Sequence, residues 1–172
     1  RREVVLDRGE AAFDVAKDVS RPFVVNAGDG MVTAFGTHFQ IRREHGQVAV
    51  TLIEGRVRIE RPSRREAEWL DPGQQAVFAE DAAGITRRNV DVKALTSWMS
   101  GRLEFNEVPM ARAIAEANRY SSRKIRIADP GIGDILVSGT FRAGDSDTIA
   151  AAFEAAFGVR VEYDRNGILL RR

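Results

Sequence analysis

The chain has 172 residues, and its 26 Lys and Arg nearly balance its 25 Asp and Glu, which leaves a formal net charge of +1. This balance excludes the strongly basic surface typical of proteins that bind nucleic acid. The absence of cysteine excludes disulfides, thiolate metal sites and cysteine nucleophiles. We expect no cofactor and no nucleic acid partner.

Residues 1–94 consist of short stretches in which apolar and polar residues alternate, separated by turns such as Asp71-Pro72-Gly73 and Glu44-His45-Gly46. Alternation of this kind is typical of half-buried strands, and no helical period interrupts it. The pattern predicts an all-β domain, either a sandwich or a β-helix-like stack, without a long helix. The chain opens at Arg1 in a strand pattern and without a methionine, so we expect earlier strands and any membrane segment to lie upstream.

Residues 95–172 change character at Trp98. Leu103 and Phe105 alternate as in a strand, and a helix can begin after Pro109 without losing a hydrogen bond. The helix carries one apolar stripe, formed by Met110, Ala113, Ile114, Ala117 and Tyr120. Lys124–Ala128 alternates again, which predicts the order strand, helix, strand.

The same order comes a second time. Val137–Phe141 alternates, Asp145 or Ser146 can cap a helix, and Gly158 is suited to end it. The apolar stripe of this helix is Ile149, Ala152, Phe153, Ala156 and Phe157. Val159–Tyr163 is a further strand, and Asn166-Gly167 is a strong hairpin signal. We predict a duplicated α+β domain with two βαβ units, whose two helices cover one face of a sheet.

Several features could suggest a conventional active site, and each has a simpler interpretation. Gly28-Asp29-Gly30 is too short for a dinucleotide fingerprint and is better explained as a turn. His38 and His45 are the only histidines and have no nearby glutamate in a metal-ligand pattern, so no metal site is predicted. Trp69 and Trp98 are expected to be packing residues more than ligand platforms.

Gly36-Thr37 suggests a reaction of another kind, in which the chain cuts its own backbone. A threonine hydroxyl can attack the carbonyl carbon of the residue before it if the peptide is held twisted, and water can then open the resulting ester. Glycine permits both the close approach and the unusual backbone angles. These two residues are candidates for self-cleavage.

Eight stretches carry a recognisable pattern when they are taken in order: 6–15, 21–25, 33–39, 50–57, 70–74, 98–105, 118–120 and 137–141. Together they resemble the periplasmic region of the ferric citrate regulator (FecR-type) anti-sigma factors. The resemblance runs almost end to end.

The resemblance implies a single-pass bacterial inner-membrane protein whose periplasmic part ends in an STN-like domain, similar to the short domain of secretins and TonB-dependent receptors. It implies that this part binds the N-terminal signalling domain of an outer-membrane TonB-dependent siderophore receptor. Periplasmic proteases would then relay the signal to an extracytoplasmic-function (ECF) sigma factor, which would be bound only by the missing cytoplasmic segment.

The resemblance also strengthens the interpretation of Gly36-Thr37, because some family members are reported to cut themselves at a Gly-Thr pair by an N-to-O acyl shift. Gly36 would supply the carbonyl and Thr37 the nucleophile, and His38 is a candidate for proton transfer. Such cleavage happens once in each chain, so no enzyme that turns over a substrate is expected.

We expect the receptor domain to dock near the Trp98 junction and the Asn166-Gly167 hairpin, where open strand edges could accept another strand. The simpler alternative is that the hairpin merely closes the domain. Two other classes stay open: a secretin-like structural assembly module, and a cupin-like enzyme or carbohydrate binder. The missing histidine cluster counts against the last of these.

Overall fold

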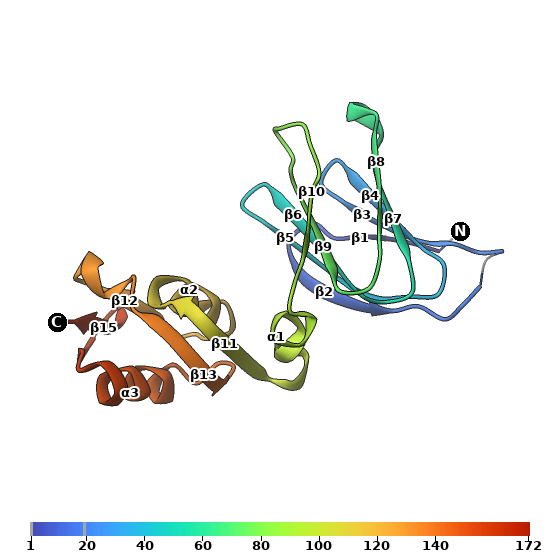
Figure 1. The fold of residues 1–172 in the computed structure, drawn as a ribbon. Helices are drawn as coiled ribbons and strands as arrows, with labels where there is room; N and C mark the ends of the chain where they lie inside the picture. Colours follow the sequence, from blue (N-terminus) through green and yellow to red (C-terminus); the bar gives the residue numbers. More distant parts are fainter. Residues whose placement is uncertain (1, 19) are drawn as a thin grey trace. The chain divides into compact units, whose positions relative to one another are not determined.

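The computed structural model describes residues 2–18 and 20–172, and the chain divides into two compact units, Arg1–Lys93 and Ala94–Arg172 (Figure 1). Each unit has a hydrophobic cluster of its own. No helix among the described residues is long and apolar enough to cross a membrane.

The first unit contains two five-stranded sheets. Sheet I has the strand order β1-β3-β4-β7-β8, and sheet II has the order β10-β9-β6-β5-β2. The neighbouring strands are antiparallel except β1 and β3, which run parallel. The strands are β1 (Arg2–Val5), β2 (Gly9–Asp14), β3 (Phe23–Ala27), β4 (Gly30–Ala34), β5 (His38–Glu44), β6 (Gln47–Glu54), β7 (Val57–Arg61), β8 (Glu66–Leu70), β9 (Gln74–Ala79) and β10 (Thr86–Asn89), with a 3-10 turn η1 (Pro62–Arg64) before β8.

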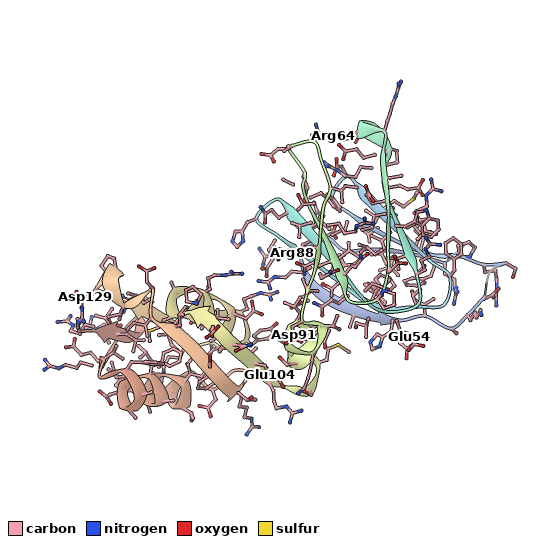
Figure 2. The ribbon with its side chains drawn as sticks, in the orientation of Figure 1. Glu54, Arg64, Arg88, Asp91, Glu104 and Asp129 are labelled. Atoms are coloured by element: carbon pink, nitrogen blue, oxygen red, sulfur yellow. The ribbon has the colours of Figure 1, made fainter. Side chains whose placement is uncertain are left out.

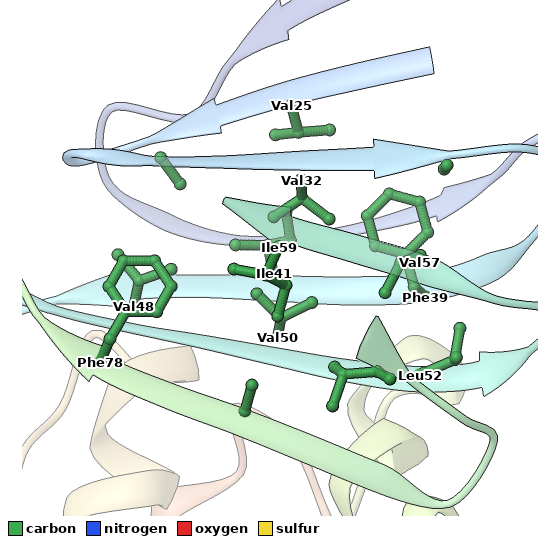
Figure 3. Close-up of a cluster of buried hydrophobic side chains, with 14 of the residues drawn as sticks. Val25, Val32, Phe39, Ile41, Val48, Val50, Leu52, Val57, Ile59 and Phe78 are labelled. Atoms are coloured by element: carbon green, nitrogen blue, oxygen red, sulfur yellow. The ribbon is translucent and has the colours of Figure 1, made fainter. Parts of the chain in front are cut away.

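The core of this unit lies between the two sheets (Figure 3). Val32 and Ile59 of sheet I and Ile41 and Val50 of sheet II have no exposed surface. Their polar strand neighbours point away from the core, because successive side chains of a strand face opposite sides. The prediction of a β-rich first domain is confirmed, and the two packed sheets form a sandwich.

Two elements close in sequence to the unit boundary after Lys93 were not predicted. All four residues of β10 are exposed, so no apolar alternation marks the strand, and it is formed by pairing with β9. The helix α1 (Val92–Thr96) is only five residues long and buries none of them. Both elements are defined by backbone hydrogen bonds rather than by a hydrophobic pattern.

The second unit contains a two-stranded sheet, β11-β13, and a three-stranded sheet with the order β12-β15-β14. Its elements are η2 (Ser97–Ser100), β11 (Arg102–Pro109), α2 (Met110–Tyr120), β12 (Ile125–Ile127), η3 (Pro130–Ile132), β13 (Leu136–Arg142), α3 (Ser146–Phe157), β14 (Arg160–Asp164) and β15 (Gly167–Arg171).

The expectation of one sheet covered on one face by two helices was wrong. The strands that flank each helix, β11 and β12 around α2 and β13 and β14 around α3, belong to different sheets. Both sheets and both helices contribute side chains to one buried cluster, for example Phe105, Ile114, Phe153 and Ile168. The two helices thus share a core with two small sheets.

The ends of the helices follow the sequence signals. Pro109 directly precedes α2, and Gly158 ends α3 in the left-handed conformation at φ +66°. The side chain of Asp145 caps α3 by accepting a 3.1 Å hydrogen bond from the Thr148 N–H. This hydrogen bond lowers the pKa of the Asp145 carboxyl.

Candidate functional site

Gly36 and Thr37 lie in the connection that carries the chain from β4 of sheet I to β5 of sheet II. Gly36 has φ +103°, a conformation that favours glycine. The Thr37 N–H donates to the Val15 carbonyl at 3.1 Å, and the Val15 N–H donates to the Thr37 carbonyl at 3.0 Å. These two bonds continue the β2–β5 ladder, so the backbone of Thr37 is fixed directly after the unusual angle of Gly36.

Neighbouring backbone crowds the Gly36–Thr37 peptide from two sides. A Cβ added to Gly36 would lie 2.6 Å from the Cα of Lys17. A Cβ added to Gly55 would lie 2.7 Å from the Gly36 carbonyl oxygen and 2.7 Å from Cγ2 of Thr37. Gly55 belongs to the connection from β6 to β7, so two connections between the sheets touch at this point.

The Thr37 side chain is 4% exposed, and its Oγ1 has no hydrogen-bond partner in the described part of the chain. A buried hydroxyl without a partner lowers stability, because it has lost its hydrogen bonds to water. Attack of this Oγ1 on the adjacent Gly36 carbonyl carbon would close a five-membered ring. The geometry therefore offers a desolvated hydroxyl beside a glycine carbonyl in a constrained backbone.

The two histidines lie at opposite ends of β5. His38 begins the strand, is half-buried, and is in register with Asp14 of β2 and Glu54 of β6. His45 lies in the tight turn after the strand, at φ +50°. Residues 2–18 and 20–172 contain no group of three His, Cys, Asp or Glu side chains that could hold a metal ion. Of the two histidines, only His38 is adjacent to Thr37 in the sequence.

An aromatic contact lies beside the Gly36–Thr37 peptide. The ring of Phe35 stacks on that of Trp69 in β8, with centroids 6.4 Å apart. The guanidinium of Arg56, the residue after Gly55, lies 4.7 Å from the Trp69 ring centroid. Trp69 is 38% exposed, so it covers the outside of the sandwich and is absent from its core. The three side chains link the two connections that touch at Gly36 and Gly55.

The residues predicted to bind a partner lie in the second unit. Trp98 is in η2 and packs against the hydrophobic cluster of this unit. The hairpin between β14 and β15 is present, but its exposed turn consists of Arg165 and Asn166, and Gly167 begins β15. The Asn166 N–H donates to Oδ1 of Asp164 at 2.7 Å. A role in binding stays a prediction for all three residues.

Four of the described strands of the second unit are edge strands. β11 and β13 pair only with each other, and β12 and β14 each pair only with β15. Leu136 on β13 is 55% exposed, and Tyr163 on β14 is 60% exposed. Such edges can accept a further strand from a partner.

The contact of Gly55 with the Gly36–Thr37 peptide was not predicted. Gly55 lies between two alternating stretches, which indicates a turn, but a turn signal gives no information about what packs against it. The contact joins connections that are far apart in the sequence and close only because both cross between the same two sheets.

Residues 1–58 match the model of the family described as FecR protein. Two crystal structures of a "putative anti-sigma factor" from Parabacteroides distasonis ATCC 8503, at 2.50 and 1.65 Å, are similar to the chain with a TM-score of 0.75 and 25% identity. The similarity covers 98% of this chain and 80% and 81% of those chains. A comparison with curated proteins gave no match.

Proposed function

This chain is of the FecR type of anti-sigma factors, and we propose that it is the periplasmic, signal-receiving part of such a regulator. In this proposal it binds the N-terminal signalling domain of a TonB-dependent siderophore receptor. Binding leads to regulated proteolysis and to release of an ECF sigma factor held by a cytoplasmic segment, with one inner-membrane helix between the two parts. The observation that supports the proposal most is the similarity to the anti-sigma factor structures, which extends over both units.

We propose that the receptor domain docks on the second unit by adding a strand to an edge. The edges of β13 and β14 support this, because neither has a second neighbouring strand in the described part of the chain. Main-chain pairing would provide affinity, and exposed side chains such as Leu136 and Tyr163 would select the partner.

Chemical-shift mapping tests this docking. The chain is labelled and titrated with the signalling domain of each TonB-dependent receptor from the same genome. We expect saturable shifts for one receptor, concentrated on β13 or on β14 and the Asn166-Gly167 turn. Shifts confined to residues before 95 would contradict docking on the second unit, and an absence of binding to every receptor would contradict the proposed function.

The order of pairings also supports a duplicated origin of the second unit, as in the STN-like domains. β11 and β13, which precede the two helices, pair with each other, and β12 and β14, which follow them, both border β15. This arrangement keeps one alternative open, a secretin-like assembly module. Light scattering distinguishes the two: a stable ring formed without any receptor domain would favour the assembly module.

A specific observation favours a second function, a single self-cleavage between Gly36 and Thr37. The buried Thr37 hydroxyl without a partner, next to a glycine at φ +103°, supports it. Oγ1 of Thr37 attacks the Gly36 carbonyl carbon, the bond from that carbon to the Thr37 nitrogen breaks, and the hydroxyl proton ends on the nitrogen. Water then hydrolyses the ester, which leaves a carboxylate on Gly36 and a free amine on Thr37.

Mass spectrometry of the purified protein, expressed with its upstream sequence, tests self-cleavage. We expect two fragments divided between Gly36 and Thr37, and one intact chain for Thr37→Ala. Thr37→Ser keeps a hydroxyl and should still be cut. A single intact mass for the wild-type protein would contradict the proposal. His38→Ala would show whether the imidazole transfers a proton, because it should then slow cleavage without changing the cut position.

A further inference from the structure

We propose that Gly55 is a positioning residue for the self-cleavage of the Gly36–Thr37 peptide, an inference that rests on the second function proposed above. A Cβ on Gly55 would come within 2.7 Å of the Gly36 carbonyl oxygen, 2.7 Å of Thr37 Cγ2 and 3.1 Å of Thr37 Cα. All three atoms belong to the two residues whose bond is cut. Gly55 therefore packs directly on the reacting group, although it is distant from it in the sequence.

The contact with Cγ2 determines where the nucleophile points. Cγ2 and Oγ1 are both attached to Cβ of Thr37, and a β-branched side chain has few accessible values of χ1. Because Cγ2 occupies the space that a Cβ on Gly55 would fill, the observed rotamer places Oγ1 on another side of Cβ. The missing side chain of Gly55 thus creates the space that the methyl group occupies in the observed rotamer.

The contact with the Gly36 oxygen positions the electrophile. A side chain at position 55 would displace the oxygen or the whole connection, since a Cβ is not found within 3.0 Å of another heavy atom. A displacement of about 1 Å can slow a reaction about a hundredfold, because the attacking atom leaves its line of approach.

Side-chain contacts on the outside of the sandwich link the two connections. Phe35, which precedes Gly36, stacks on Trp69, and Arg56, which follows Gly55, lies over the ring of Trp69. These contacts join the residues that flank the two glycines. The close approach of Gly55 to Gly36 is therefore supported by side chains that are independent of Thr37.

Gly73 provides a matched control for substitution of Gly55. Gly73 has φ +85° and Gly55 has φ +86°, so alanine brings similar backbone strain at either position. A Cβ at Gly73 would have no atom within 4 Å, in contrast to a Cβ at Gly55. A difference between Gly55→Ala and Gly73→Ala thus reports the contact with the Gly36–Thr37 peptide.

The experiment is a pulse–chase of the full chain with its upstream sequence, which follows conversion of the precursor into two fragments. We expect Gly73→Ala to be cut at the wild-type rate and Gly55→Ala to be cut at least about tenfold more slowly. Hydroxylamine should not restore cleavage of Gly55→Ala, because little ester forms when the hydroxyl is misplaced. Equal rates for the two variants would overturn the inference.

Two further results separate positioning from a loss of fold. Thr37→Ser removes the methyl group that Gly55 contacts, so it should be cut more slowly than wild type, and Gly55→Ala should have a smaller effect in that background. A Thr37→Ser chain cut as fast as wild type would overturn the inference even if Gly55→Ala does not fold. If wild-type protein stays uncut, the self-cleavage itself is wrong and the role of Gly55 is wrong with it.

Discussion

The guanidinium of Arg61, which has no exposed surface, donates hydrogen bonds to both carboxylate oxygens of Asp29 at 2.9 to 3.2 Å. Arg61 ends β7, and Asp29 lies in the turn between β3 and β4. The same guanidinium donates to Glu66 and to the carbonyl oxygens of Ala79 and Ala82. Figure 2 shows Arg64 at this end of the sandwich and Glu54 at the other end.

Asp29→Ala should lower the free energy of unfolding of the first unit by about 3 kcal/mol, because it leaves a buried cation with less compensation. Urea titration of the whole chain measures this. The control is Glu68→Ala, which removes a 3.8 Å pair with Arg87 whose side chains are 42% and 47% exposed, and it should change stability by less than about 0.5 kcal/mol. Equal losses of stability for both variants would show that the buried pair of Arg61 and Asp29 is no more stabilising than an exposed pair.

The side chain of Asn118 should stabilise the backbone of β12. Its side-chain amide donates to the Ile125 carbonyl and accepts from the Ile125 N–H, both at 2.8 Å. Asn118→Ala leaves two polar groups of the buried Ile125 without partners, and we expect a loss of about 2 to 3 kcal/mol. Hydrogen exchange measures the loss of stability at this site. The Ile125 amide should exchange faster in the variant, and an unchanged rate would contradict a stabilising role of the Asn118 side chain.

Asp18 should make stability depend on pH in acid. The hydroxyl of Ser20 and the guanidinium of Arg21 donate to its carboxylate at 2.6 and 2.8 Å, and these bonds lower its pKa from 3.8 to about 2. A carboxyl whose pKa falls on folding stabilises the folded state above its unfolded pKa, and this contribution is lost as the pH falls towards the folded pKa. The stability difference between wild type and Asp18→Asn should therefore be present at pH 5 and mostly lost at pH 2.

If the chain is cut after Gly36, the two fragments should stay together. The first fragment would contain β1, β3 and β4 of sheet I and β2 of sheet II. β4 pairs with β7 and β2 pairs with β5, so the fragments share both sheets and the core between them. We expect one peak on size-exclusion chromatography in native buffer and two species in denaturant. Separation in native buffer would contradict this topology.

Local signals in the sequence located most elements. Alternation at Val137–Phe141 marked β13, and the apolar stripe at Met110, Ala113, Ile114 and Ala117 marked the buried face of α2. These signals work because each strand or helix buries one face whatever its partners are. The elements without such a face, β10 and α1, were missed.

The grouping of strands into sheets could not be predicted from the same signals. A strand that buries one face has the same alternation in one large sheet as in two small ones, so the pattern of Leu103 and Phe105 carried no information that β11 would pair with β13 alone.

The sequence by itself determined the two classes of fold, the helix boundaries at Pro109, Asp145 and Gly158, and Gly36-Thr37 as a candidate site. Only the tertiary structure decided that the Thr37 hydroxyl is buried without a partner in the described part of the chain, and that Gly55 packs on the Gly36–Thr37 peptide. The reason is that burial and close contact are set by how connections cross between the sheets, and this depends on the packing of the whole sandwich.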